Sequence, residues 1–246
     1  MNKKNFFYII YDNAKTLIGA LIIAVLIRSF LFQPFYIPSS SMEPTLLVGD
    51  RIFVSKFTYG YSKHSFPFSP NVTNKRFFSK LPKRGDLVVF KTPADNRTDY
   101  IKRLIGLPGD TIQFVNGELF INDKNILRKK IVNNRVIRCG NFLLETDLFI
   151  ETLPNGVKHL VTYKKQGSLQ NTKKFKVPSE HYFLLGDNRD CSKDSRYLDS
   201  VGYVNKLNFV GKAKLIFFSN DTNIGSLLKF WNLNKSFRSE RLFKGL

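Results

Sequence analysis

Three consecutive serines, Ser39, Ser40 and Ser41, lie between Pro38 and Met42 in the stretch IPSSSMEPT. A serine hydroxyl is a weak nucleophile and reacts only when a neighbouring base can take its proton. Serine and proline are also common turn residues, so the stretch could equally be a plain turn. Whether one of these serines does chemistry therefore depends on a base elsewhere in the chain.

Lys102 is a candidate for that base. In the predicted strand DYIKRLI, residues 99–105, side chains alternate between two faces, so Lys102 shares its face with Tyr100 and Leu104 while Arg103 points away. Burial among apolar side chains lowers the pKa of a lysine, because desolvation disfavours the ammonium form. On this pattern alone, an edge-strand lysine in solvent is the commoner case.

The stretch GDNRDCSKDSR, residues 186–196, follows the predicted strand 182–185 and carries charges of both signs among small residues. Asx turns and Asp–Arg pairs would make it a rigid polar loop. A solvent-exposed loop with incidental ion pairs is the alternative, and composition does not separate the two.

Other chemistries have less support. The histidines His64, His159 and His181 stand in ordinary contexts, and although a Ser-His-Asp triad is assembled in space rather than in sequence, a lone histidine near a strand is more often structural. The chain contains no HExxH or Walker A motif, so we expect no metal and no cofactor. Its only SxxK, Ser226 to Lys229, lacks the partner motifs of the penicillin-binding proteins.

The chain is strongly basic, with 39 Lys and Arg against 19 Asp and Glu and a formal charge of +20. Such a charge attracts polyanions, meaning nucleic acid or an anionic lipid surface. No zinc-finger spacing, RNP-type motif or basic zipper region occurs, so we expect anionic lipid headgroups and no nucleic acid as partners. Cys139 and Cys191 lie 52 residues apart with no CxxC, and although they could pair, we expect two free thiols.

Residues 17–27 form an apolar run that SFLF extends past Arg28. No small-x-small cleavage site follows, so we expect a retained transmembrane anchor over residues 16–33 rather than a cleaved signal. Arg28 can snorkel toward the headgroups from one turn before the end of the helix. A collar of aromatic residues suited to the interface follows: Phe30, Phe32, Phe35 and Tyr36. The alternative is a buried core helix.

The flanks of the run predict its orientation. Lys3, Lys4 and Lys15 precede it, whereas Gln33 to Asp50 contains no Lys or Arg. The positive-inside bias therefore predicts a cytoplasmic N-terminus, residues 1–15, in a single-pass inner-membrane protein with everything after Phe32 on the outer (periplasmic) face.

Beyond the anchor, short runs rich in Val, Ile, Phe and Tyr alternate with turn residues, which favours an antiparallel, mainly β fold. Residues 34–112 and 178–246 are expected to form one catalytic β domain. The Lys- and Asn-rich residues 113–177 are expected to form a smaller inserted β subdomain. Residues 224–233 could form an amphipathic basic helix on lipid or a plain surface helix.

Four stretches, in this order and spacing, resemble the bacterial type I signal peptidases, a family of membrane-anchored Ser/Lys endopeptidases. They are FLFQPFYIPSSSMEPTLLVGD (30–50), RGDLVVF (84–90), DYIKRLIGLPGD (99–110) and GDNRDCSKDSR (186–196). The resemblance spans most of residues 17–218. It implies a serine endopeptidase that removes signal peptides from secreted preproteins. A catalytically inert, anchored β module that binds a partner or anionic lipid is the alternative.

The resemblance also implies roles for single residues. Ser41 would be the nucleophile and Lys102 the general base, while the Ser41 amide and the Ser39 hydroxyl would form the oxyanion hole. Ser192 would hold the Lys102 amine, and four charged residues would brace its loop: Asp187, Arg189, Asp194 and Arg196.

Two positions depart from the family pattern. Ser40 replaces a common glycine, and Cys191 stands where a polar residue such as Asn is expected. A Ser41 Oγ to Lys102 Nζ distance of about 3 Å would favour the enzyme over the inert module.

Overall fold

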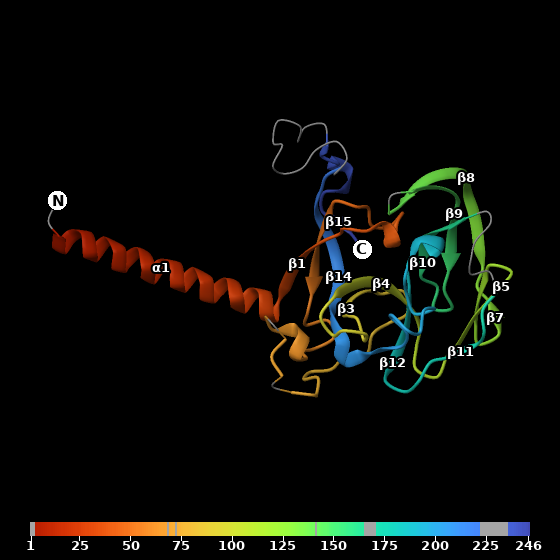
Figure 1. The fold of residues 1–246 in the computed structure, drawn as a ribbon, viewed down its shortest axis with the longest axis horizontal. Helices are drawn as coiled ribbons and strands as arrows, with labels where there is room; N and C mark the ends of the chain where they lie inside the picture. Colours follow the sequence, from red (N-terminus) through yellow and green to blue (C-terminus); the bar gives the residue numbers. More distant parts are fainter. Residues whose placement is uncertain (1–2, 68, 72, 141, 165–170, 222–235) are drawn as a thin grey trace.

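The structure is a computed structural model that describes residues 3–67, 69–71, 73–140, 142–164, 171–221 and 236–246. One long helix projects from a body made of β-strands (Figure 1). The prediction of a mainly β fold with one N-terminal helix is therefore confirmed.

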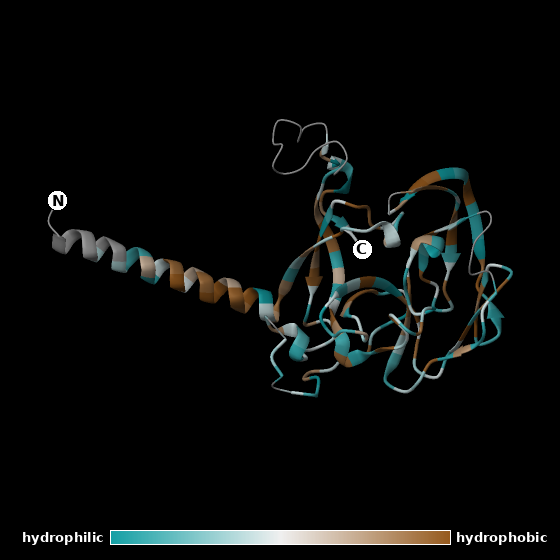
Figure 2. Cartoon of the chain, viewed as in Figure 1, coloured by the Kyte–Doolittle hydropathy of each residue, from teal (hydrophilic) through white to brown (hydrophobic). Residues whose placement is uncertain are grey.

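Helix α1, Lys3–Phe30, contains the apolar run. Its part from Tyr11 to Phe30 is long and apolar enough to cross a membrane, and almost none of that part is buried against the rest of the chain. Figure 2 shows the apolar colouring along this part of the helix. The helix starts earlier than the predicted anchor, 16–33, and ends three residues sooner, because Phe32–Tyr36 pair with a neighbouring strand instead of continuing the helix.

The main sheet is antiparallel and has the strand order β1-β2-β14-β3-β4-β12-β13, with β15 pairing β14 from the side. Strand β14 lies between β2 and β3, and β12 pairs with β4, so strands from residues 32–106 and from residues 181–245 share one sheet. The strands are β1 Phe32–Tyr36, β2 Asp50–Ser55, β3 Leu87–Lys91, β4 Asp99–Gly106, β12 His181–Leu185, β13 Val204–Asn205, β14 Phe209–Ser219 and β15 Lys244–Gly245.

The chain between β4 and β12 forms two smaller antiparallel sheets, in the place where the insertion 113–177 is expected. One has the order β11-β5-β6-β7 and the other β10-β9-β8. Their strands are β5 Thr111–Val115, β6 Glu118–Ile121, β7 Lys124–Asn125, β8 Arg128–Cys139, β9 Phe142–Thr152, β10 Lys158–Lys164 and β11 Phe175–Lys176.

The main sheet and the sheet β11-β5-β6-β7 share one hydrophobic core. One buried cluster combines Ile105 of β4 and Phe183 of β12 with Phe114 and Ile121 of the insertion. Burying a side chain of this size contributes about 1.5–3 kcal/mol, so β4 and β12 are held from the side of the insertion as well. A second cluster lies under β1, β2 and β14 and includes Met42.

The expectation of two free thiols is wrong, because Cys139 and Cys191 form a disulfide. Strand β8 carries Cys139 at its far end and runs beside β9 back toward the main sheet, which brings its Cα within 5.5 Å of that of Cys191. The sequence separation of 52 residues did not predict the disulfide, because the pairing depends on where the β8–β9 ribbon lies relative to the loop that contains Cys191.

The predicted C-terminal helix, residues 224–233, lies outside the described residues. The segment that follows returns to the main sheet, where Leu246 N donates to Lys214 O at 2.9 Å. Arg241 forms an ion pair with the buried Asp50 at 2.6 Å. This segment therefore supports the β2 end of the sheet.

Candidate active site

Ser41 lies in a single 3-10 turn, η1, Ser40–Met42, that follows β1. Met42 is completely buried, and Ile37 and Leu46 pack into the same cluster on either side of the serines. These apolar anchors fix the turn and leave the Ser41 side chain at the wall of a cavity. The short run of serines is thus held by its hydrophobic neighbours.

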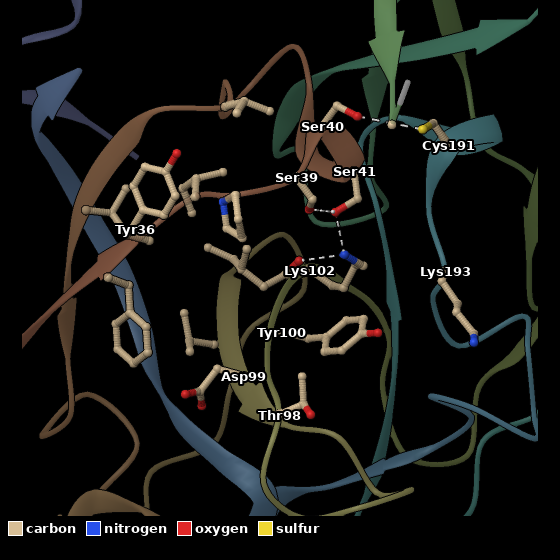
Figure 3. Close-up of a pocket in the computed structure, with 18 of the residues that line it drawn as sticks. Tyr36, Ser39, Ser40, Ser41, Thr98, Asp99, Tyr100, Lys102, Cys191 and Lys193 are labelled. Carbon is tan, nitrogen blue, oxygen red and sulfur yellow. Dashed lines mark hydrogen bonds between the residues drawn. The ribbon is translucent and has the colours of Figure 1, made fainter. Parts of the chain in front are cut away.

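Lys102 reaches the same point from β4. Its Nζ donates to Ser41 Oγ at 2.7 Å and to Ile101 O at 2.9 Å. Figure 3 marks the contact between Lys102 and Ser41 with a dashed line. The Lys102 side chain is 2% exposed, and its Nζ is 5.3 Å from the centre of the Tyr100 ring. The predicted strand face, with Tyr100 beside Lys102, therefore meets the serine turn.

Burial lowers the pKa of Lys102 to about 8. The carboxylates of Asp194 and Asp187 act in the opposite direction, and Arg196 adds to the lowering. A lysine with such a pKa has a substantial neutral fraction near pH 8, and a neutral amine can accept a proton. The arrangement can therefore take the proton of the Ser41 hydroxyl.

The other two serines differ in their surroundings. Ser39 Oγ lies 3.3 Å from Ser41 Oγ, on the same side of the turn. Amides that open a helical turn have no acceptor within it, which leaves the first N–H groups of η1 available. Ser40 points elsewhere: its Oγ is 3.7 Å from Cys191 Sγ. Its φ is not in the left-handed region, so this position does not require the glycine common in the family.

The loop 186–196 packs directly on the serine turn. Asn188 donates to the carbonyls of Ser41 and Ser40, from its backbone at 3.2 Å and from its side chain at 3.1 Å. A Cβ at Gly186 would lie 2.2 Å from Ser192 Oγ and 2.5 Å from Ser41 O, so only glycine fits there. Ser192 Oγ is buried and makes no hydrogen bond to Lys102 within the described part of the chain, but it lies close enough to Asp194 to help lower the pKa of that carboxyl.

Four charged residues of the loop are buried in ion pairs, two of which leave the loop. Asp194 pairs with Arg196 at 2.8 Å, within the loop. Asp187 pairs with Arg103 at 2.7 Å, and Arg189 pairs with Glu151 of β9. Arg103 and Glu151 were not among the predicted site residues.

A signal for Arg103 was present in the sequence. Arg103 stands in an apolar strand, and a buried charge requires a partner. Burial alone would raise the pKa of Asp187 and Asp194, but the adjacent guanidinium groups of Arg103 and Arg196 outweigh it and lower both pKa values. Both carboxylates are therefore ionised and held in fixed positions.

The histidines lie apart from the serine. His159 is buried beside Glu151, with its Nε2 3.3 Å from the carboxylate, and His64 Nδ1 is 3.1 Å from Ser69 Oγ. His181 Nδ1 lies 2.7 Å from Ser179 O. Among the described residues, none of the three contacts Ser41 by a hydrogen bond.

The Ser–Lys pair opens into a cavity of about 800 Å³. Apolar residues such as Phe35, Ile52 and Ile101 line it together with Arg138 and Lys193. Figure 3 shows Tyr36 and Lys193 on opposite sides of the Ser–Lys pair.

Strand β1 pairs with β2 on one edge, and its other edge has no partner strand among the described residues. Strand β12 pairs with β4 from Arg103 to Gly106, so the first part of β4, from Asp99 to Lys102, has no described partner strand on that edge. Within the described part of the chain, both walls of the cavity therefore have a free strand edge.

Fold and site together define a mainly β protein with one apolar N-terminal helix and a buried Ser–Lys pair at an elongated cavity. The model of the family "Signal peptidase, peptidase S26" matches residues 10–218. A signal peptidase I of Rickettsia typhi is 41% identical over 247 residues, which cover 91% of this chain and 89% of that protein. A signal peptidase I of Rickettsia bellii is 39% identical, with 94% and 84% covered.

A crystal structure of a signal peptidase I from Enterococcus faecalis is 27% identical and covers 54% of this chain and 97% of its own, with a TM-score of 0.32. On the family model and the rickettsial relatives, the chain belongs to the signal peptidase family S26.

Proposed function

We propose that this protein is a membrane-anchored serine endopeptidase that removes signal peptides from secreted preproteins. The observation that carries the proposal is the 2.7 Å contact between the buried Lys102 amine and Ser41 Oγ. Relatives of the chain are signal peptidases I. The short distance favours the enzyme over an inert β module, for which the two groups would have no reason to meet.

Neutral Lys102 takes the proton of the Ser41 hydroxyl as Ser41 Oγ attacks the scissile carbonyl. The protonated lysine then gives this proton to the leaving amine. A water molecule, deprotonated by Lys102, hydrolyses the acyl-enzyme and frees Ser41. Burial of Lys102, which lowers its pKa to about 8, makes the neutral amine available for the first step.

The oxyanion that forms during attack needs donors fixed in advance. The Ser41 amide at the start of η1 and the Ser39 hydroxyl, 3.3 Å from Ser41 Oγ, are the groups in reach. One such donor contributes about 3–4 kcal/mol in the transition state. The Ser192 hydroxyl is buried beside Gly186, close to Ser41 O, and we assign it the role of holding the Lys102 amine during the reaction.

The ion pairs of the loop position these groups without touching the substrate. Asp187 joins the loop to Arg103, the residue after the base, and to Thr45, four residues after the nucleophile. Arg189 and Asp194 keep the remainder of the loop in place through Glu151 and Arg196. We therefore assign all four predicted bracing residues, Asp187, Arg189, Asp194 and Arg196, a positioning role.

An extended peptide fits the cavity. Free strand edges on both walls can hydrogen-bond to a peptide backbone, in the manner of β-strand addition. Residues of β1, the strand that follows α1, line the cavity together with apolar side chains such as Ile52 and Ile101, so we expect the residues before the scissile bond to lie beside β1. This arrangement suits a signal peptide, whose cleavage site follows its apolar core.

The anchor places the site at the membrane. Helix α1 provides a span, and lysines precede it while none follows before Asp50, which predicts a cytoplasmic N-terminus. The disulfide between Cys139 and Cys191 supports the same orientation, because disulfides persist in oxidising compartments such as the periplasm.

The test is cleavage of a preprotein by the detergent-solubilised full chain, with the new N-terminus identified by mass spectrometry. The wild type should cut once, after the signal peptide. Ser41→Ala and Lys102→Ala should each lose activity by several orders of magnitude, as the loss of a nucleophile or its base does in other serine proteases.

Matched controls are Ser40→Ala, the adjacent serine, and Lys193→Ala, an exposed lysine lining the same cavity. Both should retain most of the activity. Thermal unfolding checks that all variants fold. Wild-type activity in a folded Ser41→Ala or Lys102→Ala variant would disprove the assignment.

A further inference from the structure

A second cavity, of about 580 Å³, lies where α1 meets the β body. Its walls come from the last turn of α1 with Arg28, from the short 3-10 turn η2, Lys63–Ser65, and from the segment that connects β3 to β4. Phe35 and Asp99 line both cavities, but Arg28, Lys63 and Arg97 line only this one of the two. The cavity therefore needs its own explanation.

The cavity carries excess positive charge. Four cations line it, Arg28, Lys63, Lys91 and Arg97, against the carboxylates of Asp95 and Asp99. Lys91 is paired with Asp99 at 2.9 Å. Asp95 accepts hydrogen bonds from the hydroxyls of Thr92 and Thr98 and from two backbone amides of its own turn.

The other three cations have no such partner among the described residues. The charged groups of Arg28, Lys63 and Arg97 make no ion pair or hydrogen bond with any residue in the part of the chain that the structure describes. Neighbouring groups respond to this charge. The pKa of the buried Lys56 is lowered to about 8, by burial first and then by the charge of Arg28. Burial and then Lys63 lower the pKa of His64 to about 4, so His64 is neutral at pH 7.

The cavity is fixed relative to the end of the span. The Tyr61 hydroxyl donates to Phe30 O at 2.9 Å, and the Lys56 amide donates to Leu31 O at 3.1 Å. The Phe30 ring packs edge-on against Phe66, 5.7 Å away, just after η2. The wall that carries Lys63 is thus attached to the last turn of α1, and Figure 2 shows the change from apolar to polar colouring at this junction.

The span from Tyr11 to Phe30 is about 30 Å long at 1.5 Å per residue, the thickness of the hydrocarbon layer. Its polar end, with Arg28, therefore lies at the depth of the lipid headgroups. A headgroup phosphate there would meet three cations that lack other partners. Arg and Lys both bind phosphate oxygens, Arg through two parallel hydrogen bonds.

We propose that this cavity binds the headgroup phosphate of an anionic phospholipid through Arg28, Lys63 and Arg97. The inference rests on the proposed membrane anchor and adds a defined lipid site to it. Each Lys or Arg beside an anionic lipid surface changes affinity by about fivefold. Removing two of the three cations should therefore weaken the binding of such a lipid by about 25-fold.

The test uses the purified full chain in detergent, titrated with phosphatidylglycerol or phosphatidylcholine, with bound lipid counted by native mass spectrometry. The wild type should bind phosphatidylglycerol more tightly than phosphatidylcholine. The double variant Lys63→Gln/Arg97→Gln should lose most of that difference. The matched control is Lys124→Gln/Lys129→Gln, two exposed lysines on β7 and β8, far from α1 in Figure 1.

Equal binding of the two lipids by the wild type, or equal losses in the double variant and its control, would overturn the proposal. A separate titration with glycerol 1-phosphate distinguishes a soluble phosphate: tight binding of it without a preference for phosphatidylglycerol would overturn the lipid assignment. Cleavage of a short soluble peptide, measured on the same samples, reports on the active site. Its absence in the wild type would contradict the proposed function and leave the lipid result standing on its own.

Discussion

At the scale of single residues, the site depends on the removal of one lysine from water. Lys102 is 2% exposed, and this burial is the largest cause of its lowered pKa, which is about 8. The carboxylates of Asp187 and Asp194 limit the shift by favouring the ammonium form. The protein thus keeps a lysine that is mainly protonated at pH 7 but can still act as a base.

The first prediction concerns pH. Because the neutral amine of Lys102 is the active form, kcat/KM for a short peptide should rise about tenfold per pH unit below its pKa of about 8 and level off above it. Lys102→Arg should be inactive throughout, since a guanidinium does not lose its proton in this range. Rates that stay flat, or fall, between pH 6 and pH 8 would argue against Lys102 as the base.

The second prediction separates the neighbouring serines. Ser39 Oγ lies 3.3 Å from the nucleophile, whereas the Ser40 side chain points to Cys191. Ser39→Ala should lower kcat by about 10²–10³-fold, as the loss of one oxyanion donor does, with little change in KM. Ser40→Ala should keep nearly full kcat. Steady-state kinetics measures both effects, and equal effects of the two substitutions would contradict the assignment of Ser39 to the oxyanion hole.

At the scale of elements, the site is assembled where β1, β4, the loop after β12 and the β8–β9 ribbon meet. The ribbon brings Cys139 to Cys191, next to Ser192 in the loop, and residues on both sides of the disulfide line the cavity. Glu151 of β9 holds Arg189 of the same loop. The inserted strands therefore act on the active-site loop as well as on the core.

The third prediction follows from this connection. Replacing both cysteines by alanine should lower the free energy of unfolding by about 2–4 kcal/mol, the usual contribution of a disulfide. It should also lower kcat/KM, because the loop next to Ser192 loses one of its attachments. Urea unfolding and peptide kinetics measure the two effects. A double variant that loses stability and retains full activity would show that the disulfide does not position the loop.

The positions of several strands could be predicted from the sequence, but the order of the strands in the sheet could not. Short runs of apolar residues between turn residues indicated the strands near 99–105 and 182–185, since such patterns are local. The sheet order, the disulfide and the pairs of Asp187 with Arg103 and Arg189 with Glu151 depend on contacts between distant segments. A single sequence contains no local pattern that specifies such contacts.

Single site residues were predicted unequally well. The identities of Ser41 and Lys102 came from the family resemblance, because the residue pattern alone favoured an exposed lysine. Asn188, which donates to the carbonyls of Ser40 and Ser41, was missed because an asparagine in a polar loop resembles a turn residue. The end of the anchor was misplaced by three residues, since the apolar residues of β1 continue the composition of the helix.

At the scale of the whole molecule, the β body and helix α1 are packed separately. Among the described residues, the three buried clusters contain no residue of α1. The last turn of the helix contacts the body through Phe30 and the buried Ser29, whereas the described large apolar side chains before it are exposed. The body should therefore fold without most of the helix, and the anchor should act by keeping enzyme and membrane-inserted substrate together.

The fourth prediction tests this separation. A fragment that begins at Arg28 keeps the last turn of α1 and all of β1. It should cleave a short soluble peptide with the kcat/KM of the full chain. Against a preprotein in the same vesicles, it should be slower by about 10²-fold or more, because it loses the effective concentration that co-anchoring provides. Equal rates for both forms on the vesicle substrate would contradict the role of the anchor.

The central claim, attack by Ser41 with Lys102 as its base, is tested most directly by trapping the acyl-enzyme. The full chain is mixed with an activated peptide ester, quenched in acid within the first turnover, and mapped by mass spectrometry. We expect the acyl group on Ser41 in the wild type and a strongly reduced rate of acylation in Lys102→Ala. An acyl group on Ser39 or Ser40, or acylation of Ser41 at the wild-type rate without Lys102, would contradict the mechanism.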